Sequence, residues 1–237
     1  MNRFKDTTFI VKFLTFIFLP SIILIYNAVN NFIYNLSFSE EVLKEIVDHN
    51  YIHPYISAFM IFFSTVVSIV LLFTSCFYEK TYGIRKILLI FLAIFYFALF
   101  VQNVVTYGNE WYHTYFKGNH NSTLVYTLGS LTIALFTMLF NLFKSFLTFK
   151  LFIAKKSANK FILFVAICAV LMQFANILLD ILTRYEYSFS LNVSFNYYLE
   201  IKYVIYSAIC GYSNFCLIYF GFRNNSFVKG EVTVEKL

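Results

Sequence analysis

The run ILLIFLAIFYFALFVQNVVT, residues 87–106, decides the fold of this 237-residue chain. It contains no charged side chain. About twenty apolar residues are what one helix needs to cross the hydrocarbon core of a membrane. Further runs of this kind occur along the chain, and together they predict helices at about 9–34, 55–77, 87–106, 124–143, 161–182 and 199–221. The sequence therefore predicts an all-α integral membrane protein, a bundle of six transmembrane helices.

Composition supports this fold class. Hydrophobic residues make up 60% of the chain and charged residues only 13%, with a mean hydropathy of +0.71, whereas soluble domains carry roughly a quarter charged residues. The apolar runs lack the two-residue alternation of barrel strands, which favours helices. We expect residues 1–237 to form a single polytopic membrane domain, with 222–237 as a short cytoplasmic tail.

Basic residues orient the predicted helices, because lysine and arginine gather in cytoplasmic loops. Fourteen of the eighteen fall in the two termini and in the second and fourth loops, where Arg85 and Lys144 are counted. We therefore predict that both termini are cytoplasmic. The net charge of +6 is spread over these loops, so we expect membrane lipids as partners and no nucleic acid; possible protein partners stay unknown.

Glycosylation acceptor sequences agree with this orientation. The tripeptides that begin at Asn35, Asn121 and Asn192 fall one in each predicted outer loop, while that of Asn224 falls in the cytoplasmic tail and should be silent. Asn35, Asn121 and Asn192 are the candidate glycosylation sites. Their use predicts a membrane of the secretory pathway.

Polar residues within the predicted helices gather in the outer half of the bundle. Polar groups inside spans usually face other helices or a wet cavity. One interpretation is a polar cavity for a lipid headgroup or a small polar ligand. The other is hydrogen bonding between helices, with Asp180 reaching the interface beside Arg184. This candidate outer polar layer consists of Asn27, Asn31, Gln102, Asn103, Gln173, Asn176, Asp180 and Glu200.

All four histidines are expected on the outer side, and His53 and His120 are candidate pH-sensitive residues, since imidazole titrates near neutral pH. Ordinary loop residues are the alternative. No catalytic motif, phosphate loop or dinucleotide fingerprint occurs in the sequence, so no catalytic residue, cofactor or metal site is predicted. The sequence leaves open whether the protein is an enzyme and favours the view that it is not.

Several short strings resemble the damage-regulated autophagy modulator (DRAM) family, in the wider group of Frag-type, Sfk-type and GPI-anchor lipid-remodelling proteins. FLPS at 18–21 resembles its entry to the first helix, and HPYIS at 53–57 is similar to its entry to the second. YSAICGYSNFCLIYF at 206–220 resembles its last helix. His120 corresponds to a histidine before the fourth helix, with His113 as the alternative.

The resemblance implies an endomembrane protein, in the lysosome or late endosome first and otherwise in the endoplasmic reticulum, Golgi or plasma membrane. It implies a modulator of autophagy or lysosomal function that acts through lipid handling or membrane organisation. A transporter, or a GPI-lipid-remodelling factor that uses the outer polar layer, is the alternative. Ala58 and Gly211 stand where the family often places acidic residues, so an activity that depends on those acids would be lost.

Overall fold

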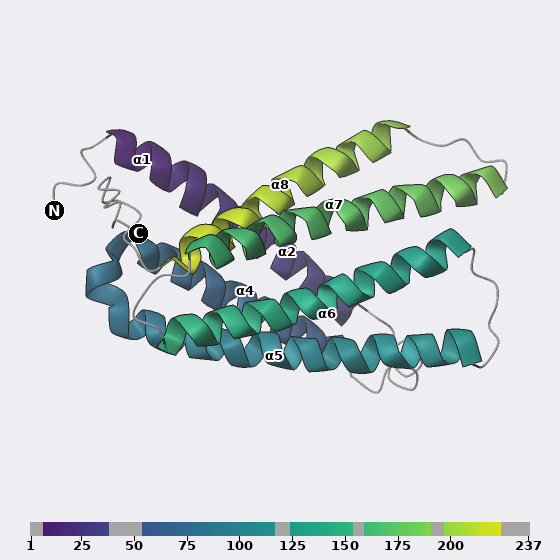
Figure 1. The fold of residues 1–237 in the computed structure, drawn as a ribbon. Helices are drawn as coiled ribbons and strands as arrows, with labels where there is room; N and C mark the ends of the chain where they lie inside the picture. Colours follow the sequence, from purple (N-terminus) through teal and green to yellow (C-terminus); the bar gives the residue numbers. More distant parts are fainter. Residues whose placement is uncertain (1–6, 38–53, 117–123, 154–158, 191–196, 224–237) are drawn as a thin grey trace.

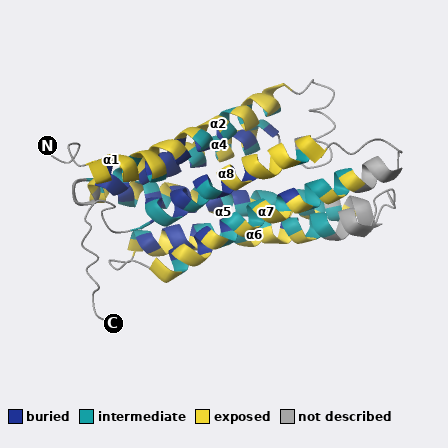
Figure 2. Ribbon diagram, turned by 90° about the horizontal axis from the view of Figure 1, so that it is seen from above, coloured by how far each residue is buried: buried dark blue, intermediate teal, exposed yellow. Residues whose placement is uncertain are grey.

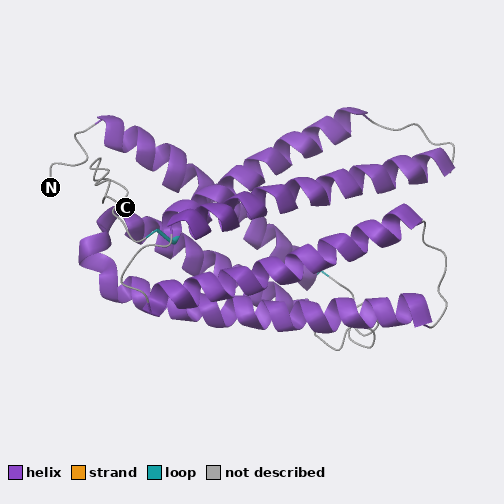
Figure 3. Cartoon of the chain, viewed as in Figure 1, coloured by secondary structure: helices purple, strands orange, loops and turns teal. Residues whose placement is uncertain are grey.

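A computed structural model describes residues 7–37, 54–116, 124–153, 159–190 and 197–223, and these are almost entirely helical, with no strand among them (Figure 3). The first helix comprises α1 (Thr7–Phe13), a π-helical segment (Leu14–Phe18) and α2 (Leu19–Leu36). The others are α4 (Pro54–Thr74), a 3-10 turn (Ser75–Phe77), α5 (Tyr78–Phe116), α6 (Leu124–Ile153), α7 (Asn159–Ser190) and α8 (Tyr197–Gly221).

Six of the described helical stretches are long and apolar enough to cross a membrane, as predicted. No more than 44% of the core window of any span is buried inside the bundle. Large apolar side chains therefore cover the outside of the bundle, where Figure 2 shows the exposed residues. A helix satisfies its backbone hydrogen bonds internally, which hydrocarbon requires. The six helices indicate an integral membrane protein.

The helices pack as a ring in the order α2, α4, α5, α6, α7 and α8, with α8 returning to α2 and also contacting α4. Successive helices run in opposite directions (Figure 1). Thr7, Thr74, Ile153 and Gly221 consequently lie at one end, which we call the closed end. The opposite end, where α2, α5 and α7 end, we call the open end (Figure 1).

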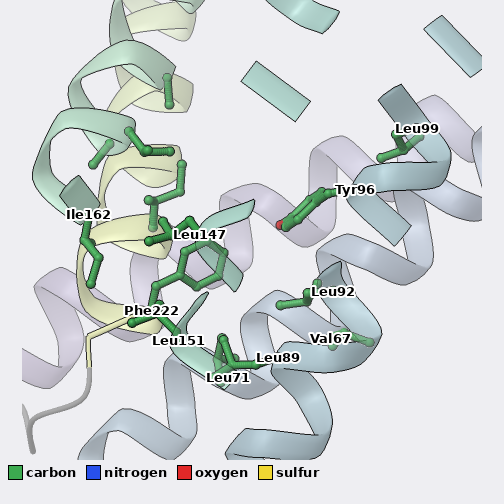
Figure 4. Close-up of a cluster of buried hydrophobic side chains, with 14 residues drawn as sticks. Val67, Leu71, Leu89, Leu92, Tyr96, Leu99, Leu147, Leu151, Ile162 and Phe222 are labelled. Carbon is green, nitrogen blue, oxygen red and sulfur yellow. The ribbon is translucent and has the colours of Figure 1, made fainter. Parts of the chain in front are cut away.

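An apolar core holds five helices together near the closed end (Figure 4). Leu71 of α4, Leu92 of α5, Leu147 of α6, Ile162 of α7 and Phe222 after α8 are all fully buried within it. Dispersion contacts of this kind drive helix association in membranes, where lipid is as apolar as the side chains. The core cluster therefore closes the bundle at this end.

Three helix ends at the closed end meet at Arg85, which is 2% exposed. Its Nη1 donates hydrogen bonds to the Leu71 carbonyl (2.8 Å) and to Thr74 Oγ1 (2.9 Å). Its Nη2 donates to the carbonyls of Gly221 (2.7 Å) and Arg223 (2.9 Å). The last carbonyls of a helix lack intrahelical donors and carry partial negative charge. The guanidinium thus caps α4 and α8 from within α5.

The second and fourth loops are shorter than the sequence predicts. Arg85 was predicted to lie in a loop, but α5 begins at Tyr78, directly after the 3-10 turn. Lys144 was likewise assigned to a loop, but α6 continues to Ile153. Both predictions were wrong, because basic residues lower the hydropathy of a run without ending a helix, and lysine and arginine are good helix formers.

The π-helical segment lies just before Pro20. Proline has no N–H and clashes with the turn before it in a regular helix. The wider turn joins the Leu19 N–H to the Leu14 carbonyl. In that register the donor to the Thr15 carbonyl would be Pro20, and the hydroxyl of Tyr212 on α8 donates to this carbonyl instead (3.0 Å). The last helix thereby completes the hydrogen bonding of the first.

Candidate functional site

A cavity of about 520 Å³ lies inside the ring, on the open-end side of the core cluster. Among the described residues that line it, four are apolar, Leu24, Ile61, Leu99 and Leu217, and the others carry polar groups. The polar lining consists of Ser57, Ser64, Thr65, Ser68, Tyr96, Gln102, Asn103, Thr106, Tyr107, Thr137, Asn141, Lys144 and Asn214.

One wall of the cavity is a row of hydroxyl residues on α4. Ser64 and Thr65 both donate to the Ile61 carbonyl, and Ser68 donates to the Ser64 carbonyl (2.6 Å). Such bonds satisfy a hydroxyl within its own helix. Ser68 Oγ is also 3.0 Å from the hydroxyl of Tyr96. The three hydroxyls are satisfied within α4 and their side chains are small, so polar surface lines the cavity without filling it.

Lys144 stands at the inner end of this cavity. Its Nζ is 4.1 Å from the ring centroid of Tyr96 and 4.6 Å from that of Phe140. No carboxylate and no hydrogen-bond acceptor of the described residues pairs with this ammonium group. Nine residues separate Lys144 from the end of α6, about 14 Å along the helix at 1.5 Å per residue. In a hydrocarbon core about 30 Å thick that α6 spans to its end, this depth would be near the middle.

A second cavity, of about 200 Å³, meets the first at Lys144 and extends between α6 and α7. The two cavities share Tyr96, Thr137, Asn141, Lys144, Asn214 and Leu217. The second adds Gln173 and Asn176 of α7. A group that occupies the junction would therefore face amide side chains from three helices.

The candidate outer polar layer divides into three parts in the structure. Gln102 and Asn103 line the larger cavity, and Gln173 and Asn176 line the smaller one. Asn27 joins α2 to α8, since it accepts a hydrogen bond from the Tyr206 hydroxyl and donates to Cys210 Sγ (3.1 Å). Both interpretations of the layer therefore find examples among its members.

The rest of the layer lies away from both cavities. Asn31 accepts hydrogen bonds from Asn35 in the last turn of α2. Asp180 pairs with Arg184 one turn along α7, and Arg184 also pairs with Glu200 on α8 (3.3 Å). The Asp180–Arg184 pair is about half exposed, so it adds little stability. The three charges link α7 to α8 and do not line either cavity.

Several sequence-based candidates lie outside the described residues: His53, His120, Asn121 and Asn192. Among the described residues, no group of three or more histidine, cysteine or acidic side chains is placed to hold a metal ion. The four cysteines are free thiols. Ala58 is 2% exposed, and a side chain at Gly211 would meet Val170 and Gln173.

The sequence analysis missed the residues at the cavity junction, above all Lys144, Asn141 and Asn214. Thr137, Asn141 and Lys144 follow helical spacing at i, i+4 and i+7, which places them on one face of α6. That pattern was readable in the sequence. It was overlooked because the predicted fourth helix ended at residue 143, which separated Lys144 from Thr137 and Asn141.

Comparison of the chain with protein-family models, curated proteins and solved structures gave no match. Fold and site alone define the class: a six-helix protein of membrane-spanning character with a polar cavity inside the bundle. The resemblance to the DRAM family stays a hypothesis.

Proposed function

We propose that this protein binds a membrane lipid by its headgroup in the central cavity, and that it handles or organises lipids in an endomembrane. The observation that carries the proposal is a cavity of about 520 Å³ with a polar lining inside an apolar bundle. Ligand sites commonly occupy roughly 300–1,000 Å³. An amphipathic ligand matches this arrangement, because its headgroup finds polar partners while its chains stay in hydrocarbon.

The same observations favour binding over catalysis or passage across the membrane. The core cluster fills the bundle on the closed-end side of Lys144, which supports a site reached from the open end. Among the described residues that line the cavities, no nucleophile lies beside a histidine or a carboxylate base. Lipid handling is also what the DRAM resemblance implies, and under that proposal the membrane is that of the lysosome or late endosome.

Filling the cavity tests the proposal. We expect Asn103→Phe to lower the amount of lipid that co-purifies with the protein about tenfold, equivalent to about 1.4 kcal/mol, because the ring would occupy the headgroup space. Native mass spectrometry of the detergent-purified protein measures the bound lipid.

The matched control is Val104→Phe, since Val104 is 43% exposed on the outer surface. This neighbour should retain lipid like the parent protein. Equal retention by a folded Asn103→Phe variant would contradict the proposal.

The orientation belongs to the same proposal: the termini face the cytoplasm and the open end faces the lumen. We therefore expect glycosylation at Asn121 or Asn192 and none at Asn224. Asn35 lies inside the last turn of a candidate span, so we expect it to stay unmodified. Asparagine-to-glutamine variants, compared by electrophoretic mobility with and without glycosidase, measure this directly. Modification of Asn224 would reverse the orientation.

A further inference from the structure

Lys144 is a positive charge inside the bundle, and none of the described residues that line either cavity is a carboxylate. A lysine near the centre of a membrane-spanning helix costs about 2.5–3.5 kcal/mol on insertion scales. Its contacts with the rings of Tyr96 and Phe140 return about 0.5–2 kcal/mol each. The rings therefore offset much of the cost of the charge, but they leave its hydrogen-bond donors without acceptors from the described residues.

Neutral donors surround this charge. Asn141 precedes Lys144 by one helical turn, Thr137 by two, and Asn214 reaches the same junction from α8. Amide and hydroxyl groups donate to an anion readily. Lysine is a point-charge binder of phosphate. A metal ion or an amine would meet only like charge here, so the charge balance of the junction selects an anionic group.

We propose that the junction of the two cavities is an anion site in which Lys144 binds the phosphate of a ligand, with Asn141 and Asn214 as neutral donors. This proposal rests on the proposed function and specifies its ligand: a lipid whose phosphate gives the headgroup a net negative charge. A soluble phosphate compound that enters from the open end has the same chemistry, and the experiment below separates the two sources.

The test uses the full-length protein in nanodiscs of phosphatidylcholine that contain equal small amounts of phosphatidylglycerol and diacylglycerol. Native mass spectrometry counts the lipids that stay bound. We expect the parent protein to retain phosphatidylglycerol over diacylglycerol about tenfold, and Lys144→Gln to abolish that preference. Lys144→Arg should keep it, because the charge remains. Lys150→Gln should also keep it, since Lys150 is exposed near the closed end of the same helix.

The outcomes separate the two proposals. An unchanged preference in a folded Lys144→Gln variant overturns the anion site and leaves lipid binding in place. Loss of preference in both Lys144→Gln and Lys150→Gln overturns it too, since a general charge effect would then suffice. If the parent protein retains no lipid, the proposal that it binds a lipid is wrong. In that case, the anion site predicts that inorganic phosphate raises the unfolding temperature of the parent protein more than chloride does. An equal effect of the two anions would overturn the anion site as well.

A folding defect does not leave the question open. If Lys144→Gln fails to fold, Asn141→Leu and Asn214→Leu replace it, because each removes a neutral donor and keeps the charge. Each should weaken the preference for phosphatidylglycerol severalfold. If both variants kept the full preference for phosphatidylglycerol over diacylglycerol, the junction would not be the anion site.

Discussion

Replacing Arg85 by methionine should destabilise the protein more than any other single substitution of a charged residue. The variant would leave the carbonyls of Gly221 and Arg223 without the donors that Arg85 supplies, while the Leu71 carbonyl keeps the hydroxyl of Thr74. A buried polar group left without its partner costs about 1–3 kcal/mol. We therefore expect a loss of about 3 kcal/mol or more, seen as a fall of about 6–12 °C in the unfolding temperature of the detergent-solubilised protein.

Two companion variants isolate the cause. Arg85→Lys keeps the charge but lacks the planar fork that serves four acceptors, so it should recover only part of the stability. Lys86→Met removes a neighbouring charge that lies 5.0 Å from the ring centroid of Tyr82, and it should be nearly neutral. Equal effects of Arg85→Met and Lys86→Met would show that net charge, and not capping, is what matters.

Replacing Gly129 by leucine should be the second severe change. A Cβ atom at Gly129 would overlap the side chain of Leu179 on α7. Close approach through small residues is a common basis of helix contact in membranes. Forcing a larger side chain into such a contact costs about 1–3 kcal/mol. We expect a several-fold lower folded yield by size-exclusion chromatography, with Gly129→Ala in between, because Leu179 can move its terminal methyl group.

The matched control is Gly108→Leu. A Cβ atom at Gly108 has no neighbour within 4 Å. Leucine there should be neutral or slightly stabilising, because glycine is a poor helix former. A loss of yield at position 108 as large as that at 129 would trace the effect to the membrane surface and not to the α6–α7 contact.

The helices were predictable because length and hydropathy together specify a span, and six apolar runs correspond to the six long helices. Positions inside the bundle were harder. Arg85 and Lys144 were assigned to loops because the positive-inside rule counts charges without their burial. Arg85 is hidden by carbonyls from two other helices, and Lys144 by two aromatic rings. Gly221 and Tyr96, two of these partners, come from distant parts of the chain, so hydropathy does not reveal them.

The polar layer illustrates the same difference. Helical spacing groups Gln173, Asn176 and Asp180 on one side of α7, and the first two of these line a cavity. Asp180 is turned to Arg184 instead. Spacing places residues on a face, whereas the lean of one helix against the next decides which part of that face meets a cavity and which part meets another helix.

The hydrogen bond from Tyr212 to the Thr15 carbonyl joins residues 197 positions apart. Synthesis delivers the first helix to the membrane long before α8 exists, so this carbonyl waits in hydrocarbon without its partner throughout most of translation. A chain cut short before Tyr212 would keep that defect permanently. The first span of a finished molecule therefore carries a hydrogen bond that the first span of a truncated one lacks.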